Sequence, residues 1–147
     1  MRAKKTQPLS TPCLCLALRR ASRAVSRLYD EEMRRVGLRT TQYSILRLLR
    51  DAGEVRQRDL GEVTVHEQTT LTRNLRPLVD AGWVAVRTGE DRREKWLRIT
   101  PTGLAKLEEA RPKWLRAQER MKSLLPESVW QNLMTVLPDV TCQAARE

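Results

Sequence analysis

Residues 83–103 read WVAVRTGEDRREKWLRITPTG and decide the fold of this chain. Two short strands with alternating apolar residues flank a charged loop, which contains Gly89, Asp91, Arg92, Arg93 and Lys95. A tip this basic does not serve a core, because burying an unpaired guanidinium costs free energy. It suits a narrow acidic surface that admits a two-stranded finger, such as a DNA minor groove. The stretch therefore predicts a β-hairpin that contacts DNA.

The segment directly before this hairpin, residues 64–82, has the spacing of a helix. Its apolar positions fall on one face: Leu71, Leu75 and Leu78. Thr64 followed by Glu67 has the spacing of a capping box, so the helix is expected to begin there. Pro77 loosens the last turns, yet the apolar pattern continues to Gly82. A helix that enters the major groove beside a basic hairpin predicts a winged helix-turn-helix.

Helical patterns also cover the chain upstream of this segment. From Cys13 to about Gly37 the apolar residues form one seam: Leu14, Leu18, Ala21, Val25 and Leu28. The opposite face carries Arg19, Arg20, Arg23 and Arg27. A second helix is expected to be capped by Thr40 or Thr41 and to end near Gly53. A short third helix is expected over residues 55–62.

Two further helices follow the hairpin. Thr100 and Pro101 have the signature of a cap and a first helical residue, and Pro126 opens a last helix. The apolar stripes of these helices and of the first one are longer than a compact central domain can cover. Leaving them in water costs about 25 cal/mol per Å² of apolar area. A second copy of the chain is the expected cover, which predicts a homodimer.

The predicted fold class is mostly α with a small β-hairpin wing. The architecture is a winged helix-turn-helix with a helical dimerisation region drawn from both termini. Residues 37–100 are assigned to the DNA-binding domain, and residues 13–36 and 101–147 to the dimerisation region. Residues 1–12 are expected to form a flexible basic arm.

Charge and composition narrow the partners. The 147 residues carry a net charge of +10, which indicates an anionic partner such as double-stranded DNA. No apolar run approaches the roughly 20 residues of a membrane span, and the N-terminal apolar run is too short for a signal peptide. We therefore expect no membrane partner and a cytoplasmic location. Three cysteines do not form a disulfide framework in such a chain.

Nothing in the sequence favours catalysis. His66 is the only histidine, and no Ser/His/Asp set or Gly-rich phosphate loop is present. His66 is expected to contact a phosphate or to lie exposed. The chain is therefore predicted not to be an enzyme, with no cofactor and no metal.

Candidate DNA contacts come from the 64–82 helix and from the hairpin. Arg73 is the strongest candidate for reading a base, because a guanidinium pairs bidentately with guanine O6 and N7. Weaker candidates, which contact bases, phosphates or neither, are Thr69, Thr70, Asn74 and Arg76. Arg92 and Arg93 are expected at the minor groove. Phosphate contacts are expected from Lys95, Arg56 and Arg58, although the last two also fit plain surface charges.

These residues carry a resemblance to a known family. Asp91-Arg92-Arg93, followed by Leu97-Arg98-Ile99-Thr100 and Gly103, resembles the wing signature of the MarR family of bacterial transcription regulators. The segment from Thr70 to Leu75, with Gly82, is similar to that family's recognition helix. The resemblance covers about residues 13–145. It implies a dimeric regulator, of the repressor kind, that binds a palindromic operator and is released by a small molecule or an oxidant. It also implies that Asp91 braces the wing through a nearby arginine.

A narrower resemblance concerns the signal. The run from Leu14 to Leu18, with Tyr29 and then Gln42-Tyr43, is similar to the organic hydroperoxide resistance regulators. That resemblance implies a sensing thiol at Cys15 with Tyr29 as its partner, and it brings Cys13 and Cys142 close to this site in an intertwined dimer.

Three other interpretations of these positions stay open. The cysteines also fit inert helix residues. A metal held by Cys13, Cys15 and Cys142 is a less favoured reading. A small aromatic or amphipathic ligand is the third, in a cleft lined by Tyr43 and Trp114.

The competing function from another class is an architectural protein that coats any duplex. Phosphate contacts make binding salt-dependent in both cases. Only an operator-specific regulator has a sequence-dependent affinity gap of several kcal/mol.

Overall fold

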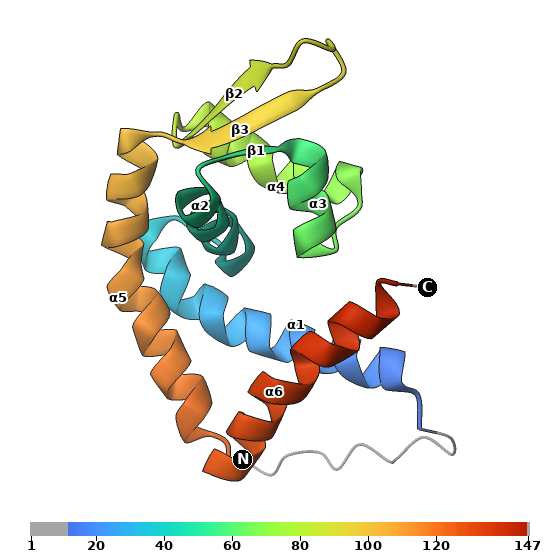
Figure 1. Cartoon of the computed structure of the whole chain (residues 1–147). Helices are drawn as coiled ribbons and strands as arrows, with labels where there is room; N and C mark the ends of the chain where they lie inside the picture. The colour runs from blue at the N-terminus through green and yellow to red at the C-terminus, as the bar shows by residue number, and fades with distance from the viewer. Residues whose placement is uncertain (1–11, 147) are drawn as a thin grey trace.

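The computed structural model describes residues 12–146, so nearly all of the basic arm predicted over residues 1–12 lies outside the described part. Its elements, in chain order, are α1 Leu14–Met33, the 3-10 helix η1 Arg34–Val36, α2 Thr40–Ala52, β1 Glu54–Arg56, α3 Gln57–Thr64, α4 Gln68–Asp80, β2 Val84–Thr88, β3 Lys95–Ile99, α5 Pro101–Ser123 and α6 Glu127–Ala144. Figure 1 shows the β2–β3 hairpin at the top of the molecule and α1 and α6 at the bottom. The predicted class, mostly helical with a small wing, is confirmed.

The wing has one strand more than the sequence predicted. β1 joins the hairpin, and the strand order in the sheet is β1-β3-β2, with both pairings antiparallel. In this register Val55 faces Leu97 and Arg56 faces Trp96. The strand escaped prediction because it has only three residues, which is too short to show an alternating pattern.

The core forms around α2, which lies between the sheet and α1 (Figure 1). Fully buried leucines from four elements meet there: Leu46, Leu71, Leu78, Leu97 and Leu107. Leu71 and Leu78 come from α4 and Leu97 from β3, so the same core fixes both α4 and the wing. The packing of α4 confirms the inward face predicted for it.

Two predicted helix caps are wrong. α4 begins at Gln68 rather than at Thr64, and its N-cap residue, Glu67, makes no side-chain cap bond. Thr64 ends α3 instead, where its hydroxyl donates to the carbonyl of Leu60 at 2.8 Å. Thr40 does not cap α2 either, because it is the first helical residue and its backbone N–H donates to Asp30 Oδ1 at 2.7 Å. Capping by a distant carboxylate leaves no mark in the local sequence.

Other local predictions are confirmed. Helix α4 continues through Pro77, and the Thr100 hydroxyl caps α5 by accepting from the Gly103 N–H at 3.0 Å. The first helical segment closes at Gly37, which has a positive φ of 70°.

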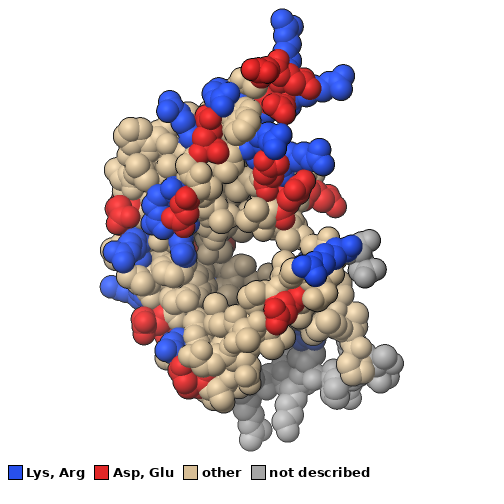
Figure 2. Space-filling model, in the orientation of Figure 1, with Lys and Arg blue, Asp and Glu red and all other residues tan. Residues whose placement is uncertain are grey.

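Both terminal helices expose apolar surface. Helix α6 has no buried residue, and Val129, Leu133, Met134, Val136 and Leu137 are all exposed on it. Leu14 and Leu16 are exposed at the start of α1. The surface over α6 in Figure 2 is mostly uncharged. Every helix in residues 12–146 is too short or too polar to traverse a lipid bilayer.

Candidate nucleic-acid interface

Helix α4 presents one polar face. Its buried leucines point to the core, and Thr69, Thr70, Arg73 and Arg76 are exposed, with Asn74 half-buried. Arg76 Nε lies 3.8 Å from Asp80 Oδ2 in the next turn. Arg73 forms no ion pair with any residue in 12–146. Of the two arginines, Arg73 is thus the one whose guanidinium is not paired with a carboxylate within residues 12–146.

Helix α3 is tied to α4 by a side-chain hydrogen bond. Gln57 Nε2 donates to Thr72 Oγ1 at 3.1 Å, and the Thr72 hydroxyl donates to the Gln68 carbonyl at 2.8 Å. His66, in the turn between the two helices, is half-buried, and its Nδ1 has no hydrogen-bond partner among the described residues. The pair of helices is therefore held as one unit beneath the wing.

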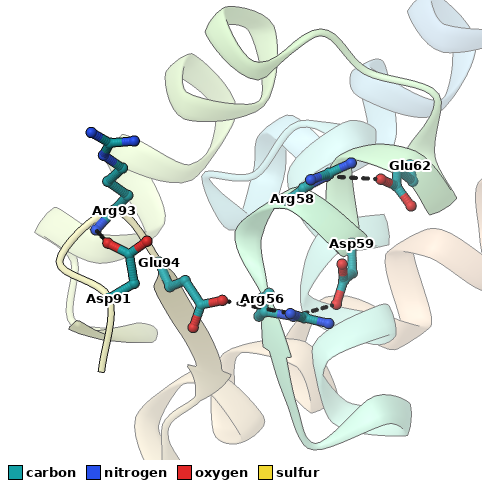
Figure 3. A network of polar contacts seen from close by, with 7 residues as sticks. All are labelled: Arg56, Arg58, Asp59, Glu62, Asp91, Arg93 and Glu94. Atoms are coloured by element: carbon teal, nitrogen blue, oxygen red, sulfur yellow. Dashed lines mark hydrogen bonds and ion pairs between the residues drawn. The ribbon is translucent and has the colours of Figure 1, made fainter. Parts of the chain in front are cut away.

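The wing loop is closed by its own backbone. Gly89 N donates to the Glu94 carbonyl at 2.9 Å, and Glu94 N donates to the Asp91 carbonyl at 2.9 Å. The Asp91 carboxylate accepts the backbone N–H of Arg93 at 2.9 Å. Asp91 therefore braces the loop through that backbone N–H, and the guanidinium pairing implied by the family resemblance is absent from residues 12–146. Figure 3 shows the Arg93 side chain pointing away from Asp91.

The link between the wing and α3 is made by Arg56. Its Nε lies 3.0 Å from Asp59 Oδ2, and its Nη1 lies 3.6 Å from Glu94 Oε1, as Figure 3 shows. The hydrogen bond to Asp59 raises the pKa of Arg56 above the ordinary value for arginine. Arg58 pairs with Glu62 in the next turn of α3 at 3.2 Å. These pairs are exposed, and solvent-exposed ion pairs contribute little stability.

A groove of about 350 Å³ lies where α3, the start of α4 and the wing meet. Its lining brings together four predicted phosphate or minor-groove contacts, namely Arg56, Arg58, Arg93 and Lys95. Asp91 and Glu94 share the same lining. The Lys95 ammonium donates to Thr88 Oγ1 across the hairpin at 3.3 Å. The groove thus gathers cations from two separate segments of the chain, residues 56–58 and 93–95, against one concave surface.

The base of the wing is held by an aromatic stack. Trp96 on β3 has the Arg87 guanidinium 4.9 Å from its ring centroid and the Arg56 guanidinium at 5.7 Å. Arg87 also donates two hydrogen bonds to the Glu54 carboxylate, at 2.8 and 2.6 Å, which lower the pKa of that carboxyl group. Cation–π contacts of this kind contribute about 0.5–1 kcal/mol each at exposed sites. Together they connect all three strands.

Sequence reasoning missed Glu54, Arg87, Glu94 and Trp96. Their partnership depends on the register of β1 against β3, and β1 was not predicted. The only local signal for this cluster was that Arg87 and Trp96 fall within the two strands predicted on either side of the wing loop.

Two of the predicted sensor residues, Cys15 and Tyr29, are separated within the chain. Cys13, Cys15 and Cys142 are all exposed free thiols. The Tyr29 hydroxyl donates to Gln118 Oε1 on α5, and burial raises its pKa. Tyr29 lies 14 residues after Cys15 on the same helix, which is about 21 Å at 1.5 Å per residue. A bond between the two side chains therefore requires a second chain.

The residues predicted to line a ligand cleft pack on each other. The rings of Tyr43 and Trp114 stack with centroids 5.8 Å apart, and Arg47 lies over the Trp114 ring at 4.6 Å. Tyr43 is buried.

Within residues 12–146 no group of three or more His, Cys, Asp or Glu side chains is placed to hold a metal ion.

A three-helix unit, an exposed polar helix α4 and a basic three-stranded wing define the winged helix-turn-helix class. Comparison with known proteins identifies the family within this class. The sequence profile of the MarR family matches residues 36–94. The HTH-type transcriptional regulator YwoH of Bacillus subtilis (strain 168) is 32% identical over 104 residues, which are 71% of this chain and 76% of YwoH. The chain therefore belongs to the MarR family of transcription regulators, which are not enzymes.

Solved structures agree with this assignment. The regulator MosR of M. tuberculosis, crystallised in complex with DNA, is 31% identical and superposes with a TM-score of 0.79 over 90% of this chain and 96% of MosR. A mutant of MarR from E. coli, complexed with operator DNA, has the same fold, with a TM-score of 0.75 at 22% identity over 86% of this chain and 92% of that one.

Proposed function

We propose that this protein binds a palindromic operator as a homodimer, represses transcription there, and is released by a small ligand or by thiol oxidation. The groove between α3, α4 and the wing is the observation that carries the proposal. Arg93 and Arg56 lie in its lining beside the start of α4, and Arg73 on that helix has no carboxylate partner within residues 12–146. The complex of MosR with DNA supports the same use of the fold.

Dimerisation is supported by the surface of α6. An 18-residue helix without a fully buried residue gains little burial from its own chain, whereas a second copy would cover the exposed leucines and valines. We assign residues 13–36 and 101–147 to this interface and residues 37–100 to DNA. Two reading units related by a two-fold axis would match a palindrome. The proposed setting is the cytoplasm, where the duplex is.

Fluorescence anisotropy with DNA from upstream of the protein's own gene tests the proposal, with a scrambled duplex as the reference. A regulator binds its site more tightly than the scrambled duplex by several kcal/mol. Equal affinity for both duplexes would instead support the architectural alternative, in which the basic face coats any sequence.

Replacing Arg73 with alanine is expected to weaken operator binding by about 1–3 kcal/mol, which is roughly 5- to 150-fold, and to remove preference at one base pair. The physical reason is the loss of a bidentate pair with a guanine. Titrations against single-base operator variants measure both effects. Arg111→Ala, an exposed cation on α5, removes the same charge and should leave affinity within about twofold. Unchanged preference in Arg73→Ala would remove this residue from base reading.

Release by oxidation is assigned to Cys15. A hydroperoxide oxidises its thiolate to a sulfenic acid and leaves as the alcohol. Treating the wild-type complex with cumene hydroperoxide is expected to lower operator affinity at least tenfold, and a thiol reductant should restore it. Cys15→Ser should not respond, whereas Cys13→Ser and Cys142→Ser, which keep the sensing thiol, should lose affinity like the wild type. A wild-type complex indifferent to peroxide would exclude this route.

The other route is a small aromatic or amphipathic ligand at the Tyr43–Trp114 stack. Such a ligand would separate the two rings or replace the Arg47 guanidinium on the Trp114 face. Both outcomes would shift α2 relative to α5, and α2 contacts the core face of α4. This is the structural basis on which a ligand there would alter DNA binding.

A further inference from the structure

Most of the net positive charge of this protein lies outside the winged helix of residues 37–100. Residues 1–29 contain seven of the 28 Lys and Arg and none of the 18 Asp and Glu, so they supply +7 of the net charge of +10. Residues 37–100 contain 12 basic and nine acidic residues, a net charge of only +3. The segment proposed to read the operator is therefore close to balanced, and the excess lies on the N-terminal segment.

The described part of this excess forms one face of α1. Its members are all exposed: Arg19, Arg20, Arg23 and Arg27. At 100° per residue they fall within an arc of roughly 100°, and at 1.5 Å per residue they span about 12 Å of helix. We call these four side chains the α1 arginine face. The apolar seam proposed for the dimer lies on the opposite side of the helix.

The arginines of the α1 arginine face differ from those near the wing because they have no carboxylate partners in the described part of the chain. Near the wing, Arg56, Arg58 and Arg87 each have a carboxylate within 3.2 Å. Within residues 12–146, the α1 arginines form no ion pair with Asp or Glu. Packing this face against a second copy would bury unpaired guanidiniums, at a cost of several kcal/mol each. The face is thus left for an anionic partner from outside the dimer.

We propose that the α1 arginine face binds the backbone of a second DNA duplex. Duplex DNA carries one negative charge per about 1.7 Å of its axis, so a 12 Å length holds about seven phosphates, enough for each of the four guanidiniums to contact one. Arginine also pairs bidentately with phosphate. In Figure 1 the wing and α1 lie on opposite sides of α2, so a straight duplex on the wing does not reach this face. The dimer would then hold two duplex segments at once.

A lipid surface fits less well. Helices that lie in the membrane interface insert Trp, Phe or Leu on the apolar side, with the aromatic residues anchoring the helix at the headgroups. Residues 1–29 have a single aromatic residue, Tyr29, and its hydroxyl is bonded to Gln118 on α5. The apolar seam of α1 is also the part proposed to pack against the second chain.

A two-colour capture experiment tests the proposal. The full-length protein is loaded on an immobilised operator duplex, and a fluorescent duplex of unrelated sequence is added at 50 mM salt. We expect the wild type to capture the second duplex and to release it by 200 mM salt. R19Q/R20Q/R23Q/R27Q should lose at least tenfold in capture, and should stay on the operator within about threefold. Gln has nearly the helix propensity of Arg, so α1 should remain folded.

Two matched variants separate the face from charge in general. R19K/R20K/R23K/R27K keeps the charge and should retain most of the capture. R34Q/R35Q/R111Q/R116Q removes four exposed cations elsewhere, none of them paired within residues 12–146, and should capture like the wild type. Equal losses in both glutamine variants would overturn the proposal, because the effect would then be one of net charge alone.

A variant that is weakened on both α4 and the wing keeps the test independent of operator binding. R73A/R93A should still bind the unrelated duplex through α1, and the four glutamine substitutions in that background should flatten the salt slope by about 3–4, near 0.9 per lost phosphate contact. An unchanged slope would overturn the proposal even if operator binding succeeds. Capture of vesicles of phosphatidylcholine and phosphatidylglycerol through these arginines, without capture of a duplex, would also overturn it.

Discussion

Leu133→Glu is expected to leave the protein monomeric and unable to hold its operator. Leu133 is exposed in the single chain, on a helix with no buried residue, and only a second copy would cover it. A two-fold interface contains the substitution twice, and each buried carboxylate without a partner costs at least a few kcal/mol. The dimer dissociation constant should rise by at least about 100-fold, which corresponds to roughly 2.8 kcal/mol. Sedimentation velocity and operator titration measure the two effects.

The matched control lies on another face of the same helix. Thr135→Glu adds the same charge at an exposed position, and only the bond from its hydroxyl to the Gln131 carbonyl is lost. It should sediment as the wild-type dimer. A Leu133→Glu protein that also sediments as a dimer would remove this face of α6 from the interface.

Gly103→Ala is expected to destabilise the fold by about 3 kcal/mol or more, near the upper end for overpacking. A Cβ at this position would lie 2.1 Å from the Trp83 carbonyl oxygen and 2.8 Å from Ile99 Cγ1. Backbone meets backbone there, so the first turn of α5 has to move. That movement strains the bond from Thr100 N to the same Trp83 carbonyl, now 3.0 Å long. Thermal unfolding should show Tm lower by roughly 10 °C.

Gly61→Ala provides the matched glycine control. The closest atom to a Cβ there is the end of the Gln68 side chain, at 2.7 Å, which is free to rotate away. Gly61 lies inside α3, where alanine is favoured over glycine by up to about 1 kcal/mol. Tm should therefore stay level or rise. Similar losses of Tm in the two variants would show that the contact with Trp83 is not what makes Gly103 necessary.

The order of elements was predictable from the sequence because each long helix carries its own periodic signal. The leucines of α4 and the Thr100-Pro101 start of α5 are local patterns, and the structure confirms both. The cluster of Arg56, Arg93 and Lys95 was predicted as a set of residue types. Their meeting in one groove was not, because it depends on how α3 and the wing pack.

What the sequence did not reveal depends on partners distant along the chain. β1 is recognisable only by its pairing with β3, and the Arg56–Glu94 contact follows from that pairing. The cap of α2 comes from Asp30, ten residues away on another helix. The local sequence suggested that Thr40 caps α2. In the folded chain, packing brings the Asp30 carboxylate to that position instead.

The Asp30 contact has a mechanical consequence. Its carboxylate, on α1, holds the backbone N–H of Thr40 at 2.7 Å, and Gly37 is the only glycine in the short connection between them. A rotation of α1 about its own axis would therefore pull on the first residue of α2 through this bond. In a dimer, the angle between the two α1 helices would thus set the spacing between the two recognition helices. The distance between operator half-sites would then be encoded far from any residue that touches DNA.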